Sequence, residues 1–367
     1  MKITAALVAA SGEDFILSDA LLDDPRPDEI LVEIKAVGVC HTDIYAQHGG
    51  FPGFKPPAVL GHEGAGIVVA TGDAVSKVTV GDRVALTFRH CGACRKCKSG
   101  HPAYCTTMPN LNYAGSRPDG TQSISVESVA VSSSFFGQSS FATHALTYET
   151  NVVRLDGCTD FSLAAPMGCG FQTGVGAVLN SFCCKAESAL LVVGGGAVGL
   201  SAVIAAKYVG CETIMVVEPV AARRDLAMEL GATLAIDPLA EHDWVKIARK
   251  KRPEGLDFVL DTTGRADALE SAMQALGPQG VLGCVGIPQG GPPPGDIKAM
   301  VVYGQSIQGI IEGDSLPDVL IPQMIALCAS GQLPLDRLIT TYPFSQINQA
   351  VADQAAGLCV KAVLTLD

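Results

Sequence analysis

The stretch from residue 189 to residue 200 constrains the fold of this chain more than any other. An apolar run at 189–193 is typical of a buried strand, and after a glycine-rich turn an apolar helix continues to residue 206. Gly194, Gly196 and Gly199 match the pattern G-x-G-x-x-G. In this pattern the glycines permit a tight turn, close approach of a pyrophosphate and close packing of the helix on the strand.

The next apolar run supports a dinucleotide site. Residues 213–217 are typical of a second buried strand, which ends in Glu218 about twenty residues past the glycines. An acidic side chain at this place accepts hydrogen bonds from a ribose diol, and it repels a 2′-phosphate. The sequence therefore predicts a site for NAD in preference to NADP.

Length and charge exclude several classes of protein. The chain has 367 residues, which suits two domains, and its net charge of −12 with no basic block argues against nucleic acid as a partner. The uncharged stretch 188–206 is long enough for a membrane helix, but its glycine cluster favours the strand–turn–helix. Residues 1–10 are interpreted as a first strand rather than an export signal, so a cytoplasmic, reducing location is expected. There the 13 cysteines serve as thiols or metal ligands.

The sequence pattern changes along the chain and predicts an α/β protein with two parts. Up to about residue 161, short β-like runs at 30–34, 66–70 and 82–87 favour a mainly antiparallel, barrel-like domain. From about residue 170, helices and strands alternate, which predicts a parallel sheet with helices on both faces. In this second part we expect helices at 220–230 and 266–276, the latter stopped by Gly277-Pro278. Further strands are expected at 234–236, 258–260 and 281–285, and a loop at 290–295.

Four cysteines form a pattern typical of a structural metal site. Cys91, Cys94, Cys97 and Cys105 give C-x2-C-x2-C-x7-C. Four thiolates at this spacing surround one tetrahedral Zn2+ and leave no open position, so this zinc is expected to hold a loop together.

A second metal site is indicated by residues scattered along the chain. Cys40, His62 and Cys169 lie in separate short motifs, each individually weak. Two thiolates and one imidazole make a three-ligand zinc site whose fourth position is open to water or substrate.

Taken in order, these motifs resemble those of the zinc-dependent medium-chain alcohol dehydrogenases over essentially the whole chain. The likeness rests on the runs 40–43 and 61–66, the four-cysteine loop, Cys169, the glycine pattern and the closing run 360–364. Residues 86–88, 134–145 and 167–174 are most similar to aryl (benzyl-type) alcohol dehydrogenases. The resemblance implies a mainly-β GroES-like catalytic domain at 1–170, a Rossmann coenzyme domain at 171–311 and a C-terminal return to the catalytic domain at 312–367.

The resemblance assigns roles at the catalytic metal. Cys40, His62 and Cys169 are expected to hold the catalytic Zn2+, giving two zinc ions per chain. Glu63 is either an alternative fourth ligand or a structural carboxylate behind the site. Asp43 is expected to orient His62.

The resemblance also implies a proton path. Thr42 is expected to hydrogen-bond the substrate oxygen and start a proton relay. Where the best-known members end that relay on a histidine, this chain has Tyr45, and His48 is either a substitute or an ordinary surface residue.

Further positions are expected to contact NAD. His41 faces the pyrophosphate, Thr173 the nicotinamide, and Arg223 the adenosine ribose, while Lys361 contacts a phosphate. The remaining cofactor positions lie in the glycine-rich turn, at Glu218 or along the carboxamide edge: Gly194, Gly196, Ala197, Val198, Gly199, Glu218, Val285, Gly286 and Ile287.

The substrate is expected to be a small primary alcohol, aromatic or allylic, that is oxidised reversibly to its aldehyde. Thr87 stands where other members carry a bulky aromatic residue and leaves room for a ring. The other candidate pocket walls are apolar: Phe51, Phe88, Ile287 and Ile311.

Two alternatives stay open: a terpenoid or specialised-metabolite alcohol, or a catalytically silent zinc scaffold that binds a nucleotide. No nucleic-acid or membrane partner is expected. The run 306–311 is a candidate edge strand for a homodimer or homotetramer.

Overall fold

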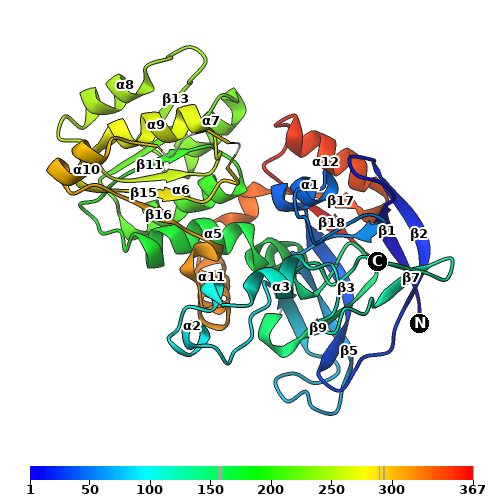
Figure 1. Ribbon diagram of the computed structural model, residues 1–367. Helices are drawn as coiled ribbons and strands as arrows, with labels where there is room; N and C mark the ends of the chain where they lie inside the picture. The colour runs from blue at the N-terminus through cyan, green and yellow to red at the C-terminus, as the bar shows by residue number, and fades with distance from the viewer. Residues whose placement is uncertain (156–158, 289, 292–293, 367) are drawn as a thin grey trace. The chain divides into compact units, whose positions relative to one another are not determined.

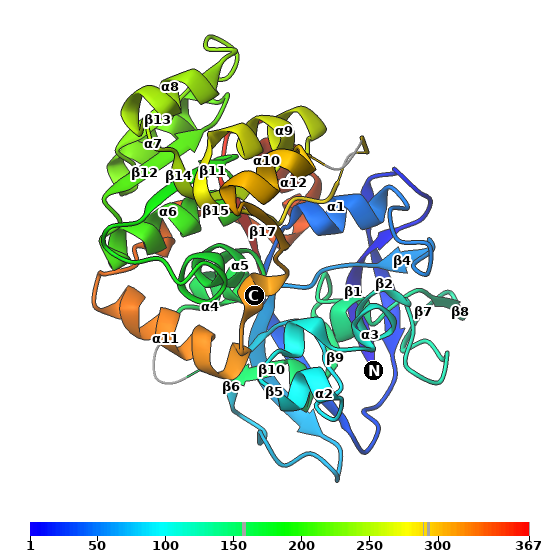
Figure 2. The same cartoon turned by 60° about the vertical axis from the view of Figure 1, so that its left-hand side comes forward.

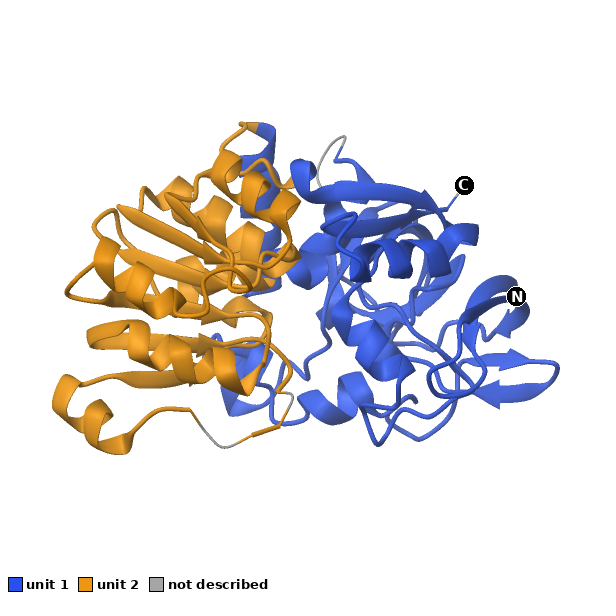
Figure 3. Cartoon of the chain, turned by 90° about the horizontal axis from the view of Figure 1, so that it is seen from above, with its two compact units in different colours: residues 1–172, 315–329, 336–367 blue, residues 173–314, 330–335 orange. Residues whose placement is uncertain are grey.

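The computed structural model describes residues 1–155, 159–288, 290–291 and 294–366. The chain forms two compact units, shown in two colours in Figure 3. Unit 1 comprises residues 1–172, 315–329 and 336–367, and unit 2 comprises 173–314 and 330–335. Of the predicted loop 290–295, residues 292–293 lie outside the described residues.

Unit 2 is built on one parallel sheet with the strand order β13-β12-β11-β14-β15-β16 (Figure 1). This is the 3-2-1-4-5-6 order of dinucleotide-binding folds, and it confirms the predicted Rossmann architecture. The strands are β11 (Ala189–Val193), β12 (Thr213–Val217), β13 (Leu234–Ile236), β14 (Leu256–Asp261), β15 (Leu276–Cys284) and β16 (Ser306–Gly309). The helices are α6 (Ala197–Val209), α7 (Ala221–Leu230), α8 (Trp244–Lys251), α9 (Ala266–Ala275) and α10 (Ile297–Tyr303).

Burial explains why this sheet forms where it does. Every residue of β11 and of β12 is buried, as expected for central strands that are covered on both faces. On one face, side chains of α8 and α9 pack against Leu191 and Met215, and helices lie on both faces in Figure 2. Helix α6 ends at Gly210, whose φ of 87° is the left-handed conformation that closes many helices.

The predicted elements of unit 2 are found with shifted boundaries, and the largest shift is at the start of β15. The expected helix at 266–276 ends at Ala275, and strand β15 already begins at Leu276. Gly277 and Pro278 therefore lie within the strand rather than in the turn that stops the helix. The strand accommodates them beside a register irregularity between β14 and β15.

Unit 1 contains two largely antiparallel sheets, which confirm the predicted mainly-β domain. Their strand orders are β4-β1-β2-β7-β8 and β10-β6-β5-β3-β18-β17, and β9 also pairs with β3. The strands are β1 (Lys2–Val8), β2 (Phe15–Leu22), β3 (Glu29–Gly38), β4 (Ala58–Val59), β5 (Gly64–Thr71), β6 (Arg83–Leu86), β7 (Ile124–Val126), β8 (Val129–Val131), β9 (His144–Tyr148), β10 (Val152–Arg154), β17 (Ile339–Pro343) and β18 (Lys361–Thr365). The helices are α1 (His41–Gln47), α2 (Arg95–Lys98), α3 (Met108–Tyr113), α4 (Phe161–Ala164), α11 (Pro317–Ala329) and α12 (Ile347–Ala355), and α5 (Gly170–Gly176) crosses the unit boundary.

The end of the chain returns to the sheet of the first unit. Strand β18 pairs antiparallel with β3 and parallel with β17, so residues far apart in sequence complete one sheet. Ala36 of β3, Ala85 of β6 and Val363 of β18 share a buried cluster with helix α4. This packing places the carboxyl end of β3, and therefore Cys40, beside Lys361 of β18. In the part of the chain that the structure describes, no helix is long and apolar enough to cross a membrane.

Candidate metal centre and cofactor site

Unit 1 brings together four potential metal ligands from separate segments. One ligand atom each of Cys40, His62, Glu63 and Cys169 lies within 4.8 Å of all the others. Cys40 precedes α1, His62 and Glu63 precede β5, and Cys169 precedes α5. The chain turns sharply before His62, where Gly61 has a φ of 90° and an added Cβ would collide with the Phe141 amide.

Asp43 holds two of these segments in place. Its carboxylate accepts hydrogen bonds from the amides of Cys40 (3.0 Å) and Gly61 (3.1 Å) and from Nδ1 of His62 (2.8 Å). The first of these bonds is the capping box at the start of α1. Because Nδ1 of His62 donates to Asp43, the lone pair of the ring lies on Nε2.

The donor set fits a bound cation. Nε2 of His62 is buried and has no hydrogen-bond partner among the residues that the structure describes. A buried polar atom without a partner destabilises the fold unless a ligand binds to it. The hydrogen bond from Cys169 is the main cause that holds the pKa of Cys40 well below its usual range, which favours the thiolate. Burial lowers the pKa of His62, but the charges of Asp43 and Cys40 outweigh burial and raise it well above its ordinary value. Zn2+ binds the neutral ring beside the Cys40 thiolate, so the metal would take the place of the proton on Nε2.

Glu63 and Lys361 form a buried pair behind the cluster. Nζ of Lys361 lies 2.5 Å from Oε2 of Glu63 and donates to the carbonyl oxygen of Val39 at 2.9 Å. The other oxygen of Glu63 accepts from the Gly170 amide at 3.1 Å. Burial raises the pKa of Glu63 to about 7.

The side chain of Lys361 is 2% exposed and its ammonium is paired with Glu63. The expected contact of Lys361 with a cofactor phosphate stays a prediction. Both roles proposed for Glu63, ligand or supporting carboxylate, are compatible with its position.

The residues of the expected proton path lie along helix α1. Thr42 is half-buried, and Tyr45 is placed one turn later with its ring edge-on to Phe51 at 5.1 Å. Nδ1 of exposed His48 is 2.8 Å from the carbonyl oxygen of Ile44, so His48 belongs to the end of the helix. His41, the first residue of the helix, is exposed.

Thr87 and Phe88 are both fully buried. The Thr87 hydroxyl donates to the carbonyl oxygen of Gly168 (2.7 Å) and accepts from Nε2 of Gln172 (2.8 Å). Thr87 thus fastens strand β6 to the turn that carries Cys169. The expectation that Thr87 leaves room for a substrate ring remains a prediction.

The four cysteines of the predicted structural site converge in the loop around α2. One ligand atom from each of Cys91, Cys94, Cys97 and Cys105 lies within 4.8 Å of the others. Backbone amides donate to three of the sulfurs: Cys94 to Cys91 (3.3 Å), Cys97 to Cys94 (3.5 Å) and Cys91 to Cys105 (3.3 Å). The amide of Cys97 is the main cause that lowers the pKa of Cys94 to about 5. These donors favour thiolates, which are the form that binds zinc.

In unit 2 the glycine-rich turn has the geometry of a phosphate cradle. Gly194 has a φ of 98°, and a Cβ at Gly199 would overlap the carbonyl oxygen of Gly194. Nothing lies within 4 Å of a Cβ built at Gly196, which leaves the backbone open to a ligand.

Glu218 lies at this turn. Its carboxylate accepts from the amides of Gly195 (2.6 Å) and Val220 (2.8 Å) and is 3% exposed in this structure. Arg224, next to the predicted Arg223, donates to the carbonyl oxygens of Glu218 and Pro219 at 2.9 and 2.7 Å. Thr173 is buried, and the other predicted contacts are half-buried: Val285, Gly286, Ile287 and Ile311.

The sequence did not identify the aromatic surroundings of His62. The Phe136 ring stacks on the imidazole of His62 with centroids 4.4 Å apart, and Phe135 meets it edge-on at 5.5 Å. Tyr113 stacks on Phe51 at 4.4 Å and meets Phe136 at 5.3 Å. Ser134 and Phe136 have positive φ values of 61° and 51°, a strained turn that no sequence pattern signals.

The sequence also did not identify Gln138 as a residue that supports the site. Its amide donates to the carbonyl oxygens of His62 (2.9 Å) and Thr87 (3.2 Å) and accepts from the Gly64 amide (3.1 Å). These three partners lie more than fifty residues away from Gln138 in the chain, so no local sequence pattern predicts this role.

Comparisons with known proteins agree with this site. Residues 26–157 match the model of the alcohol dehydrogenase GroES-like domain, and residues 197–330 match that of the zinc-binding dehydrogenases. A geraniol dehydrogenase of Castellaniella defragrans is 42% identical over 98% of this chain and 96% of its own.

Two solved structures are similar over the whole chain. The crystal structure of a benzyl alcohol dehydrogenase from Acinetobacter calcoaceticus has a TM-score of 0.96 and 38% identity, and it is covered completely by this chain. An alcohol dehydrogenase zinc-binding domain protein from Burkholderia ambifaria has a TM-score of 0.96 and 42% identity over 100% of this chain and 99% of its own. The chain belongs to the zinc-dependent medium-chain alcohol dehydrogenases. It is therefore an oxidoreductase that acts on alcohols.

Proposed function

We propose that this protein catalyses the reversible, NAD-linked oxidation of a primary aromatic or allylic alcohol to the aldehyde. The observation that carries the proposal is the convergence of Cys40, His62 and Cys169, with Nε2 of His62 buried and unpartnered. A silent scaffold has no need to keep such a set of donors buried without a ligand.

Cys40, His62 and Cys169 are the residues that hold the catalytic metal, and the four-cysteine loop holds a second ion. When bound, Zn2+ supplies Lewis-acid chemistry that lowers the pKa of an alcohol hydroxyl. Asp43 fixes the ring of His62 and the position of the Cys40 amide, so two of the three ligands are oriented before the metal arrives.

Thr42 is the residue we assign to the first proton transfer. Thr42 lies two residues after Cys40, on the first turn of α1, and its hydroxyl can accept the proton that the alcohol loses while it donates its own proton onward. From there the proton leaves towards solvent. Neither Tyr45, whose ring packs on Phe51, nor His48, whose Nδ1 faces a helix carbonyl, has a contact that continues the path.

Unit 2 is the part that we assign to NAD. The nicotinamide ring supplies the hydride acceptor when the cofactor is bound. Open backbone at Gly196 suits the pyrophosphate, and the carboxylate of Glu218 beside the Gly195 amide suits a ribose diol. A 2′-phosphate at the same place meets a buried negative charge, which favours NAD over NADP.

The aromatic residues beside His62 support an aryl or allylic substrate. Phe51, Tyr113, Phe135 and Phe136 present ring faces and edges next to a predicted metal ligand. Flat, polarisable groups pack well against such rings. The names of the two relatives, geraniol and benzyl alcohol dehydrogenase, point to the same two substrate classes.

A substrate panel tests the proposal. Formation of NADH is followed at a fixed concentration of the zinc-loaded protein with benzyl alcohol, cinnamyl alcohol, geraniol, ethanol and a secondary alcohol. We expect kcat/KM for the first three to exceed that for ethanol at least tenfold, with NAD preferred over NADP. Activity confined to ethanol or to the secondary alcohol would overturn the substrate assignment, and a preference for NADP would overturn the cofactor assignment.

A further inference from the structure

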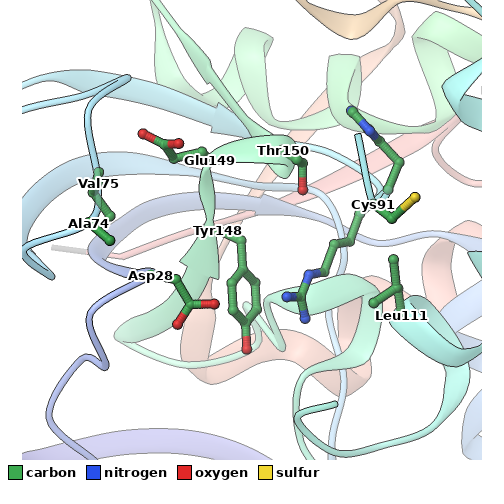
Figure 4. Close-up of a pocket in the computed structure, with 10 residues that line it drawn as sticks. Asp28, Ala74, Val75, Cys91, Leu111, Tyr148, Glu149 and Thr150 are labelled. Carbon is green, nitrogen blue, oxygen red and sulfur yellow. The ribbon is translucent and has the colours of Figure 1, made fainter. Parts of the chain in front are cut away.

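A cavity lies next to the four-cysteine loop, and none of the four potential catalytic ligands lines it. It has a volume of about 330 Å3, and its lining includes the consecutive residues Arg89, His90 and Cys91 together with Tyr148 and Thr150. None of the residues assigned to the alcohol, the catalytic metal or the nucleotide lines it. Figure 4 shows Tyr148, Cys91 and Thr150 among the lining residues.

Arg89 is a buried cation without a carboxylate partner. It is 9% exposed, and among the described residues no acidic side chain forms an ion pair with its guanidinium. The guanidinium instead lies over the Tyr148 ring, 3.2 Å from the centroid. A stacked guanidinium keeps its N–H donors directed outward from the ring, and buried donors normally find an acceptor.

The backbone holds Arg89 in this position. The buried side chain of Asn112 accepts from the Arg89 amide (2.8 Å) and donates to its carbonyl oxygen (2.9 Å). A Cβ at Gly137 would lie 2.9 Å from Cδ of Arg89, so the side chain is also confined laterally. The cation is therefore fixed at the wall of the cavity before any ligand binds.

Two of the carboxylates around Arg89, those of Glu29 and Glu149, are already engaged. Glu29 accepts from Nε and Nη2 of Arg117 at 2.7 and 3.0 Å and from the Tyr148 hydroxyl at 3.0 Å. Glu149 accepts from the Ser76 amide and, at 2.6 Å, from the Lys77 amide. Asp28 remains as an exposed carboxylate at the lining and disfavours anions of high charge.

His90 supplies a second buried polar atom. Its Nδ1 has no hydrogen-bond partner among the described residues, and the residue lines the same cavity. In the tautomer protonated at Nδ1 this atom is a donor, so a ligand that reaches it would complete a buried hydrogen bond.

From this geometry we propose that the cavity is a binding site for a small anion, a carboxylate or a phosphate group, held by the guanidinium of Arg89 and by Nδ1 of His90. Arg favours these groups because its planar fork matches two of their oxygens. The cavity has room for a molecule somewhat larger than the anionic group alone. The site is separate from the alcohol chemistry and does not depend on it.

Calorimetric titration tests the proposal on the zinc-loaded protein with excess NADH, which keeps phosphate away from the glycine-rich turn. Inorganic phosphate and acetate are the two probes, titrated separately. We expect one saturable site per chain for at least one of them, with a Kd below about 10 mM. Arg89→Gln should weaken that binding at least tenfold, while Arg154→Gln, which removes an exposed arginine with a 59% exposed side chain, should leave it unchanged.

A second variant decides the question if Arg89→Gln fails to fold. Thr150→Asp places a competing carboxylate in the wall of the cavity and leaves Arg89 present, so it should also abolish binding. The proposal is overturned if neither probe saturates a site in the wild type. It is equally overturned if binding persists unchanged in a folded Arg89→Gln or Thr150→Asp variant. The test measures anion binding and not turnover of alcohols. Its result therefore does not depend on whether the proposed enzymatic function is correct.

Discussion

At the scale of single residues, Asp43 does more than any other side chain outside the metal ligands to shape the catalytic cluster. It is fully buried and its two oxygens accept three hydrogen bonds, one from His62 and two from backbone amides. The segments before α1 and before β5 are joined through this one carboxylate.

Asp43→Asn should therefore weaken metal binding without removing a ligand. The amide has one acceptor oxygen, so it cannot serve His62 and both amides together. We expect zinc affinity to fall about 10- to 100-fold and kcat to fall with it. Competition with a chromophoric chelator measures the affinity, with Asp19→Asn, an exposed position on β2, as the matched control. Unchanged zinc affinity in Asp43→Asn would contradict the role given to this carboxylate.

Glu218 is the residue on which cofactor choice is expected to depend. Glu218→Ala removes both the ribose acceptor and the charge that opposes a 2′-phosphate. The ratio of kcat/KM for NAD to that for NADP should fall at least tenfold, or about 1.4 kcal/mol of discrimination. Glu229→Ala, at an exposed position on α7, is the control. An unchanged ratio in Glu218→Ala would show that other residues of the glycine-rich turn discriminate between NAD and NADP.

At the scale of elements, a buried ion pair ties the strands of unit 1 to the segment after α3. Arg117 and Glu29 are 2% and 1% exposed, and Glu29 stands at the start of β3. Burial raises the pKa of Glu29, but the hydrogen bonds and the charge of Arg117 outweigh burial and lower it overall.

Glu29→Gln should destabilise the protein by about 3–5 kcal/mol, because it leaves a buried arginine without its main partner. The lowered pKa adds a pH dependence. The stability from the ionised carboxylate is fully present above the unfolded pKa of about 4.3 and is lost as the pH falls through the lower folded pKa. Urea unfolding from pH 3 to pH 8 should thus show a difference between wild type and variant that shrinks below about pH 4.

The matched control for this measurement is Glu33→Gln. Glu33 pairs with Lys35 at 2.9 Å, with the two side chains 35% and 25% exposed, so its loss should cost about 0–1 kcal/mol. Equal losses from the two variants would argue against a special role for the buried pair.

At the scale of the whole molecule, sequence patterns were most informative where function imposes a local spacing. The glycine-rich turn, the four-cysteine loop and the strand–helix alternation are all set within a few residues, and the structure contains each of them. The clustering of Cys40, His62 and Cys169 has no local spacing, because more than a hundred residues separate the last from the others. Ligand chemistry suggested this set, and the family resemblance assigned its role.

What the sequence did not reveal depends on contacts between distant segments. Gln138 on the carbonyls of His62 and Thr87, and Phe136 on the imidazole, have no local signature. The pairing of Lys361 with Glu63 has no local signature either, because it joins the first residue of β18 to a residue almost three hundred positions earlier in the chain.

The edge of the unit 2 sheet is the surface we assign to self-association. Strand β16 is an edge strand, and α10 carries Ile297, Val301 and Val302 at 73%, 78% and 67% exposure. We propose that a second copy pairs here, to give a homodimer or a homotetramer. Val301→Glu should shift the mass measured by light scattering to that of a smaller assembly. Val80→Glu, at a position 65% exposed in unit 1, should not change it. A wild type that is monomeric at micromolar concentration would contradict the proposal.

The most direct test of the account is zinc content measured together with benzyl alcohol turnover in three proteins. The wild type should carry about two zinc ions per chain, and Cys40→Ser and Cys94→Ser about one each. The account predicts that Cys40→Ser loses turnover but keeps its thermal stability, whereas Cys94→Ser unfolds at a lower temperature and, while folded, still turns over. Wild-type turnover in Cys40→Ser, or complete loss of turnover in folded Cys94→Ser, would contradict the division into one catalytic and one structural metal site.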